Sequence, residues 1–105
     1  MDIEKLKIAI TKENIEWRKH AFQRMLERDI RREDVKRVIL EGEMIENYES
    51  DNKPFTSALF FKFVNNRPLH VVIAFDEKQS KIHIITTYEP NLEIFESDYK
   101  TRKKE

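Results

Sequence analysis

Apolar residues recur at helical spacing through the first forty positions of the chain. Ile3, Leu6 and Ile10 form one such stripe, and Val35 to Ile39 contains another, each separated by charged residues. A third stripe between them includes Ala21, Phe22, Met25 and Leu26. The three predicted helices span about 3–14, 18–28 and 33–41. Gly42, the only glycine of the chain, follows the last periodic residue, so we expect it to take a left-handed C-cap conformation.

After Gly42 the period of the pattern changes from 3.6 to 2, which predicts strands. The predicted strands cover 44–48, 55–64, 69–75 and 82–88, and the predicted turns cover 50–54, 65–68 and 76–81. The strand at 69–75 is apolar on both faces, as is typical of a central strand. Leu92 to Phe95 is expected to add a short helix, and residues 100–105 form a basic stretch that we expect to be a flexible tail.

This order of elements predicts an α+β fold, with N-terminal helices packed on one face of a four-stranded antiparallel sheet and a short C-terminal helix. A chain of 105 residues falls within the size of one domain, and no linker-like segment divides it. We therefore expect a single domain over 1–105, with its core at about 15–99.

The composition excludes several classes of protein. The 20 Lys and Arg residues balance 20 Asp and Glu residues, so net charge does not indicate a nucleic acid as partner. The absence of Cys excludes disulfides and thiolate chemistry. No stretch has the length of a membrane span or the apolar core of a signal peptide. These features predict a cytoplasmic protein with no membrane association.

His20, Arg24 and Arg28 recur every four residues along the second predicted helix and so share one side of it. Arg guanidinium groups match phosphate oxygens, and His titrates near neutrality. The row could therefore bind a nucleic-acid backbone or move its protons. The alternative is a solvated helix face on which Glu27 supplies an ion-pair partner.

His70 opens the central strand, on the same side as Val72 and Ala74, and Arg67 lies in the turn before it. A functional interpretation is that the sheet presents His70 toward the helix bearing His20, although a histidine on an apolar strand is more often a hydrogen-bonded core residue. Tyr88 at the end of the last strand could orient a phosphate. Tyr48 has a similar but weaker signal, and we expect no role for His83.

Glycine loops that cradle phosphates cannot form with one glycine, and the sequence lacks the motifs of zinc proteases and serine hydrolases. The three histidines have no ligand spacing, so we expect neither a metal site nor a cofactor.

Four short motifs occur in a characteristic order. They are HAFQRMLER at 20–28, GEMIENY at 42–48, PLHVV at 68–72 and ITTYEP at 85–90. Over roughly 17–102 the chain thereby resembles the domain-of-unknown-function family numbered 4258, which is grouped with RelE-like (BECR-like) small ribonuclease toxins. The resemblance implies a toxin that accompanies a small antitoxin protein. Its polar motif positions fall on His20, Arg24, Arg28, Tyr48, His70 and Tyr88. The chain departs from the family at Asp29-Ile30-Arg31, where members commonly have Gly-Ile-Ser.

The resulting leading hypothesis is a metal-independent endoribonuclease toxin of a type II toxin–antitoxin system. The ribose 2′-OH would attack the adjacent phosphate, which requires a base, an acid and cations. His20 and His70 are the acid–base candidates, with neither role assigned, and Arg24 is a catalytic phosphate stabiliser. Tyr88 would orient the phosphate. Further RNA contacts are expected from Arg28, Arg67 and Tyr48.

A second hypothesis is a non-catalytic RelE-like module that binds other proteins, which the charge balance favours. Homodimer formation through the strand at 55–63 is compatible with either hypothesis.

Overall fold

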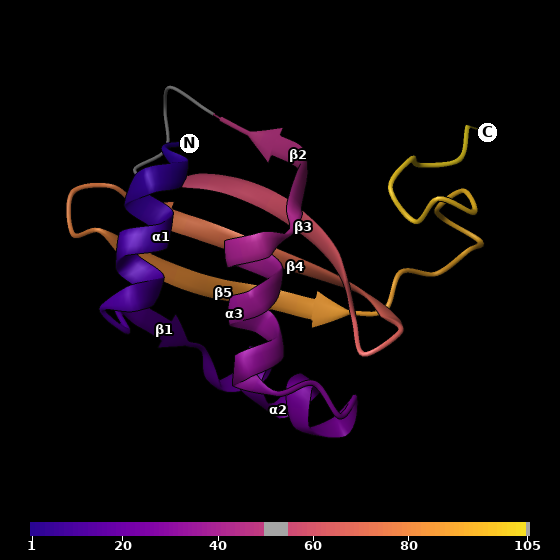
Figure 1. The fold of residues 1–105 in the computed structure, drawn as a ribbon, viewed down its shortest axis with the longest axis horizontal. Helices are drawn as coiled ribbons and strands as arrows, with labels where there is room; N and C mark the ends of the chain where they lie inside the picture. The colour runs from indigo at the N-terminus through magenta and orange to yellow at the C-terminus, as the bar shows by residue number, and fades with distance from the viewer. Residues whose placement is uncertain (50–54, 105) are drawn as a thin grey trace.

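Five strands form one mixed sheet in a computed structural model that describes residues 1–49 and 55–104 (Figure 1). The elements in chain order are α1 (Ile3–Thr11), β1 (Ile15–Trp17), α2 (Lys19–Glu27), α3 (Arg32–Glu41), β2 (Glu43–Tyr48), β3 (Thr56–Val64), β4 (Arg67–Asp76) and β5 (Lys81–Tyr88). The strand order is β1-β5-β4-β3-β2, with β1 parallel to β5 and the other neighbours antiparallel. The predicted turn at 50–54 lies outside the described residues.

The α+β class is confirmed, but the prediction of a four-stranded antiparallel sheet is wrong. The fifth strand, β1, pairs in parallel with β5 through Ile15↔Ile82 and Trp17↔Ile84. A three-residue strand shows too little alternation to be recognised in a sequence, and its partner lies more than sixty residues away along the chain.

The prediction of a helix at 92–95 is also wrong. The Asn91 side chain accepts a hydrogen bond from the Glu93 amide (2.8 Å), and the Asn91 carbonyl accepts from Ile94 and Phe95 (both 2.9 Å). These bonds form a single turn, after which Phe95 pairs with Arg102 in an isolated β-bridge. Within the part of the chain that the structure describes, no helix follows β5.

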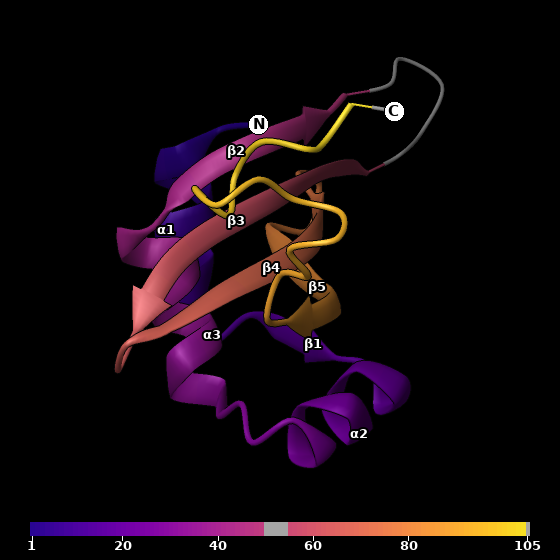
Figure 2. The same ribbon diagram turned by 90° about the vertical axis from the view of Figure 1, so that its right-hand side faces the viewer.

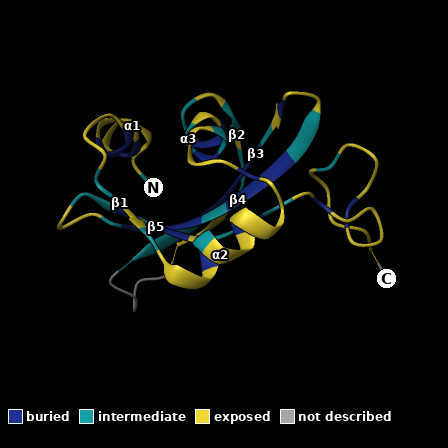
Figure 3. Cartoon of the chain, turned by 90° about the horizontal axis from the view of Figure 1, so that it is seen from below, coloured by how far each residue is buried: buried dark blue, intermediate teal, exposed yellow. Residues whose placement is uncertain are grey.

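The hydrophobic core lies between α1, α3 and one face of the sheet, as the view along the sheet shows (Figure 3). Helix α1 contributes Leu6 and Ile10, and α3 contributes Val35 and Val38. The strands contribute a matching set of fully or almost fully buried side chains: Ala58, Phe60, Leu69, Val71, Ile73, Phe75, Ile82 and Ile84.

Gly42 ends α3 as predicted, but its conformation differs from the prediction. Its φ of −84° and ψ of −173° are extended, not left-handed. A Cβ at this position would lie 2.3 Å from the Val38 carbonyl oxygen and 2.6 Å from that of Phe61. The glycine therefore allows the end of α3 to approach β3 closely.

Helix α2 packs against β5, beyond the short β1. Its Ala21 and Met25 are buried, while Arg28 donates a hydrogen bond to the Thr87 carbonyl of β5 (2.6 Å). These contacts attach the helix to β5. Asp29 follows with a φ of 53°, a left-handed conformation that Asp tolerates better than most residues with a Cβ.

The segment that follows β5, residues 91–104, crosses the sheet on the side away from α1 and α3 (Figure 2). Most residues of this segment are exposed, as expected of the predicted basic tail. Two of its cations nevertheless form ion pairs with β2, Lys100 with Glu43 (3.0 Å) and Arg102 with Glu46. The Lys103 amide also donates to the Ile94 carbonyl (2.8 Å). We call residues 91–104 the C-terminal strap.

Candidate functional site

His70 and Tyr88 are direct partners in the β4–β5 register and lie on the sheet face under the C-terminal strap. His70 Nδ1 is 3.3 Å from the Tyr88 hydroxyl, and His70 Nε2 is 2.6 Å from the Tyr99 carbonyl oxygen. Because a carbonyl can only accept, Nε2 carries the proton, and in the neutral ring Nδ1 accepts from Tyr88. Burial lowers the pKa of His70, which favours this neutral form.

The imidazole of His70 is enclosed on several sides. Phe95 contacts it edge-on at 4.7 Å between ring centroids, and Phe61 does so at 5.7 Å. The residue is fully buried, and both ring nitrogens already have partners. Tyr88 is the partly exposed member of the pair, and burial raises the pKa of its phenol.

Glu46 and Arg102 form an ion pair on the same sheet face. Arg102 Nε and Nη2 donate to the Glu46 carboxylate at 2.7 and 3.1 Å, while the guanidinium lies over the Phe95 ring (4.9 Å). The Glu46 side chain is 19% exposed and that of Arg102 is 52% exposed. The Phe95 ring contacts both the Arg102 guanidinium and the His70 imidazole, which in turn lies 3.3 Å from the Tyr88 hydroxyl, so the four groups are neighbours. We call Glu46, His70, Tyr88 and Arg102 the sheet-face cluster.

Strand pairing explains why three members of this cluster meet. His70 pairs with Phe61 on β3 and with Tyr88 on β5, and Glu46 on β2 pairs with Leu59. Leu59 and Phe61 are two residues apart and so point to the same side of the sheet. The C-terminal strap, which covers this face, supplies Arg102 as the fourth member of the cluster.

The α2 candidates do not join this cluster. His20 is exposed, and Arg24 pairs with Glu27 on its own helix (2.9 Å). The hydrogen bonds and ring contacts given for His70 come from β3, β5 and the strap, and none comes from α2. In the described residues, the expected meeting of His20 with His70 is not observed.

The side chain of Arg67 instead contacts the backbone at the C-terminal end of α2, including the carbonyl of Arg28. Arg67 donates to the Asp29 carbonyl (2.6 Å) and the Arg28 carbonyl (2.8 Å), and it pairs with Glu89 (3.3 Å). Carbonyls at the end of a helix have no intrahelical partners, so Arg67 satisfies the C-terminal end of α2. Both guanidinium groups thus hold α2 against the sheet.

Tyr48 lies two residues beyond Glu46 on β2, where its side chain is 48% exposed. No hydrogen bond joins it to the sheet-face cluster among the described residues. Phe61, on the strand for which self-association is predicted, stacks on Tyr99 of the strap at 6.4 Å.

Glu46, Tyr99 and Arg102 are site residues that the sequence interpretation did not select. The sequence does indicate Glu46, because it lies two residues before Tyr48 on a strand and so points to the same face of the sheet. Arg102 belongs to a run of charged residues, a pattern that predicts a solvent-exposed segment. Tyr99 contributes only its backbone carbonyl, which a pattern of side chains does not reveal.

The cluster combines three groups with distinct chemistry. Glu46 offers a carboxylate base, and Tyr88 offers a hydroxyl proton. The Nη1 of Arg102 keeps its N–H donors, because the bonds to Glu46 use Nε and Nη2.

Among residues 1–49 and 55–104 no group of His, Asp and Glu is placed to hold a metal ion. No helix in these ranges is long and apolar enough to cross a membrane.

Comparisons with known proteins give one match. No curated protein and no solved structure matches the chain. The model of the family described as a domain of unknown function, DUF4258, matches residues 17–89, which contain Glu46, His70 and Tyr88. Because this match covers more than half of the sequence, the chain belongs to the DUF4258 family.

Proposed function

We propose that this protein is a cytoplasmic endoribonuclease toxin of a type II toxin–antitoxin system, of the RelE-like group, which cleaves RNA without a metal ion. The observation that carries the proposal is the Glu46–Arg102 ion pair on the sheet face that also carries the Tyr88 hydroxyl. A base, a cation and a proton donor on one partly exposed sheet face are what attack by a ribose 2′-OH requires.

In the proposed reaction, Glu46 takes the proton of the 2′-OH as the 2′-oxygen bonds to phosphorus. Arg102 stabilises the charge that develops on the phosphate oxygens. The bond from phosphorus to the 5′-oxygen breaks, and that oxygen receives the hydroxyl proton of Tyr88. The products are a 2′,3′-cyclic phosphate and a free 5′-hydroxyl.

His70 acts as a positioning residue in this scheme, because burial keeps it from the substrate. Its 3.3 Å bond to the Tyr88 hydroxyl is long, so the hydroxyl can turn toward the leaving oxygen. Burial raises the pKa of Tyr88, so its hydroxyl carries a proton at neutral pH and can donate it in that step.

His20 and Arg24 are exposed on α2 and would contact RNA if its backbone runs along that helix. Residues 18–37 carry eight Arg or Lys against four Asp or Glu, so this region is locally basic although the chain is neutral. Such a region can supply phosphate contacts that net charge does not reveal.

Cleavage of single-stranded RNA in the presence of EDTA tests the proposal. We expect the wild type to yield ends with 2′,3′-cyclic phosphates, and Glu46→Gln and Tyr88→Phe each to lose about 10²–10⁴-fold in rate while remaining folded. Glu16→Gln, which changes a carboxylate on β1, is the matched control and should keep full activity. Induced expression in a bacterium should arrest growth for the wild type alone among wild type, Glu46→Gln and Tyr88→Phe.

The second candidate is a non-catalytic protein-binding module, and the complete enclosure of His70 favours it. Folded wild type that neither cleaves RNA nor arrests growth would replace the toxin proposal with this one.

A further inference from the structure

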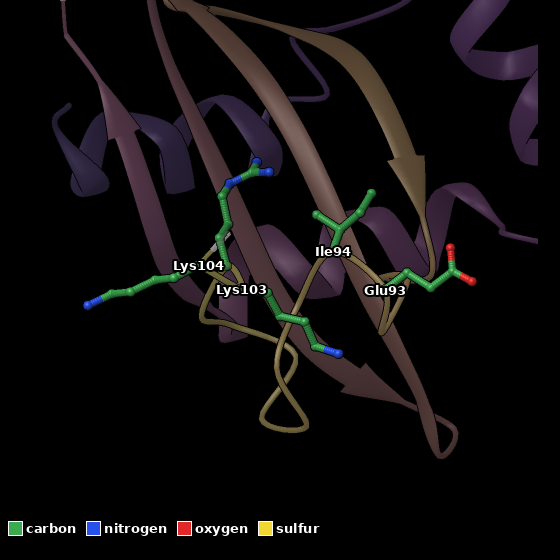
Figure 4. A pocket seen from close by; sticks show the side chains of 5 residues that line it. Glu93, Ile94, Lys103 and Lys104 are labelled. Atoms are coloured by element: carbon green, nitrogen blue, oxygen red, sulfur yellow. The ribbon is translucent and has the colours of Figure 1, made fainter.

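The C-terminal strap contains a pocket that the proposed reaction does not use. Its volume is about 360 Å³, which falls within the range of small-ligand sites. The lining residues are Glu93, Ile94, Arg102, Lys103 and Lys104. Figure 4 shows the labelled side chains around it, with those of Glu93 and Lys104 pointing away from each other.

Backbone pairing within the strap builds this pocket. The Lys103 amide donates to the Ile94 carbonyl (2.8 Å), and the Glu96 amide donates to the Thr101 carbonyl (2.7 Å). The bridge between Phe95 and Arg102 lies between these two bonds. Phe95 is buried against His70, so the paired backbone that frames the pocket is attached to the sheet.

The pocket has an excess of positive charge, although Arg102 is already paired with Glu46. Three of its five lining residues are cations and one is an acid. Among the described residues, neither Lys103 nor Lys104 forms an ion pair, so both ammonium groups can bind an external anion. Ile94 is half exposed and adds an apolar surface beside them.

We propose that this pocket binds single-stranded RNA at the nucleotide next to the cleaved one, with phosphate on Lys103 and Lys104 and the ribose or base against Ile94. The inference rests on the proposed function. Arg102 links the two sites, because it lines the pocket and also pairs with Glu46. An RNA strand whose scissile phosphate contacts Arg102 therefore passes the pocket with its neighbouring nucleotide. Cationic groups that follow a backbone beside an apolar surface are the usual elements of single-strand binding.

Equilibrium binding of a fluorescent single-stranded RNA of about ten nucleotides tests this inference. The full chain carries Glu46→Gln to prevent cleavage and is compared with the same chain bearing Lys103→Gln and Lys104→Gln. We expect the double change to weaken binding roughly tenfold and to make the slope of log K against log salt shallower by about 1.4, the value for two lost phosphate contacts.

A control pair, Lys5→Gln with Lys7→Gln, removes the same charge from exposed positions on α1 and should leave binding nearly unchanged. Equal weakening by both pairs would mean that net charge alone governs binding and would overturn the inference. So would wild-type affinity in the Lys103 and Lys104 variant, or no RNA binding by the parent chain.

The two proposals can fail separately. RNA binding that depends on Lys103 and Lys104, in a wild type that cleaves nothing, would remove the endoribonuclease proposal and support the pocket. Cleavage that depends on Glu46, with binding indifferent to the two lysines, would remove the pocket and support the endoribonuclease.

Discussion

The imidazole Nε2 of His70 donates to the Tyr99 carbonyl oxygen at 2.6 Å, so a central strand is hydrogen-bonded to the strap that follows the last strand. This single bond fixes the tautomer of His70, directs its other nitrogen to Tyr88, and holds the strap over the sheet face. The strap is therefore part of the candidate site.

The stability of the protein should fall as the pH drops below about 6.5, the ordinary pKa of histidine. Burial lowers the pKa of His70 in the folded chain, so the unfolded chain binds more protons below that pH and gains free energy relative to the folded one. Urea unfolding at about pH 7.5 and about pH 5.5 measures the loss. His70→Gln, which keeps a donor for Tyr99, should reduce it. Since the pKa of His83 is also lowered by burial, His83→Gln is the comparison, and an unchanged pH dependence in His70→Gln would contradict the prediction.

Gly42→Ala should lower the free energy of unfolding by about 1–3 kcal/mol. The added Cβ would meet the carbonyl oxygens of Val38 and Phe61, both backbone atoms that cannot turn away. Denaturant titration measures the change, with the exposed Glu41→Ala as the control that should stay within about 0.5 kcal/mol. A neutral Gly42→Ala would show that α3 and β3 can move apart at no cost.

Arg67→Ala should destabilise the fold by about 1–2 kcal/mol, because it removes the donors that satisfy the Arg28 and Asp29 carbonyls. Arg24→Ala loses only an exposed pair with Glu27 and should cost less than about 0.5 kcal/mol. Chemical denaturation of both variants compares them. Similar costs would argue against the structural role of Arg67.

Phe95→Ala should cost about 3 kcal/mol, since Phe95 is 2% exposed and fills the space between His70 and Arg102. Leu92→Ala changes a residue of the same strap that is 45% exposed, and it should be nearly neutral. Thermal unfolding compares the two. A small effect of Phe95→Ala would mean that the strap contributes little to stability.

Local patterns predicted the helices and the strands β2 to β5, because each is long enough to show its own period. They could not predict β1, whose three residues form a strand only through a distant parallel partner. The apolar residues Leu92, Ile94 and Phe95 predicted a helix, yet Asn91 forms a local turn and Phe95 is buried against His70. The place of Gly42 after the last periodic residue predicts a left-handed cap, but the close contact of α3 with β3 explains the glycine better.

The candidate site, like the fold, could be predicted only in part from the sequence. His70 and Tyr88 were selected from motifs, and strand pairing does bring them together. The interpretation that joined His20 to His70 assumed that α2 faces His70, whereas α2 packs against β5 and the strap covers His70. Arg102 could not be found from its neighbours in sequence, because its role depends on Glu46, 56 residues earlier.

That separation of 56 residues has a consequence for the nascent chain. During synthesis the carboxylate of Glu46 leaves the ribosome well before the guanidinium that completes its ion pair, and contacts so distant along a chain form late in folding. A partly translated protein therefore carries this carboxylate without its cationic partner. Under the proposed function, the ribosome that makes this protein is exposed to a competent enzyme only after translation has passed Arg102.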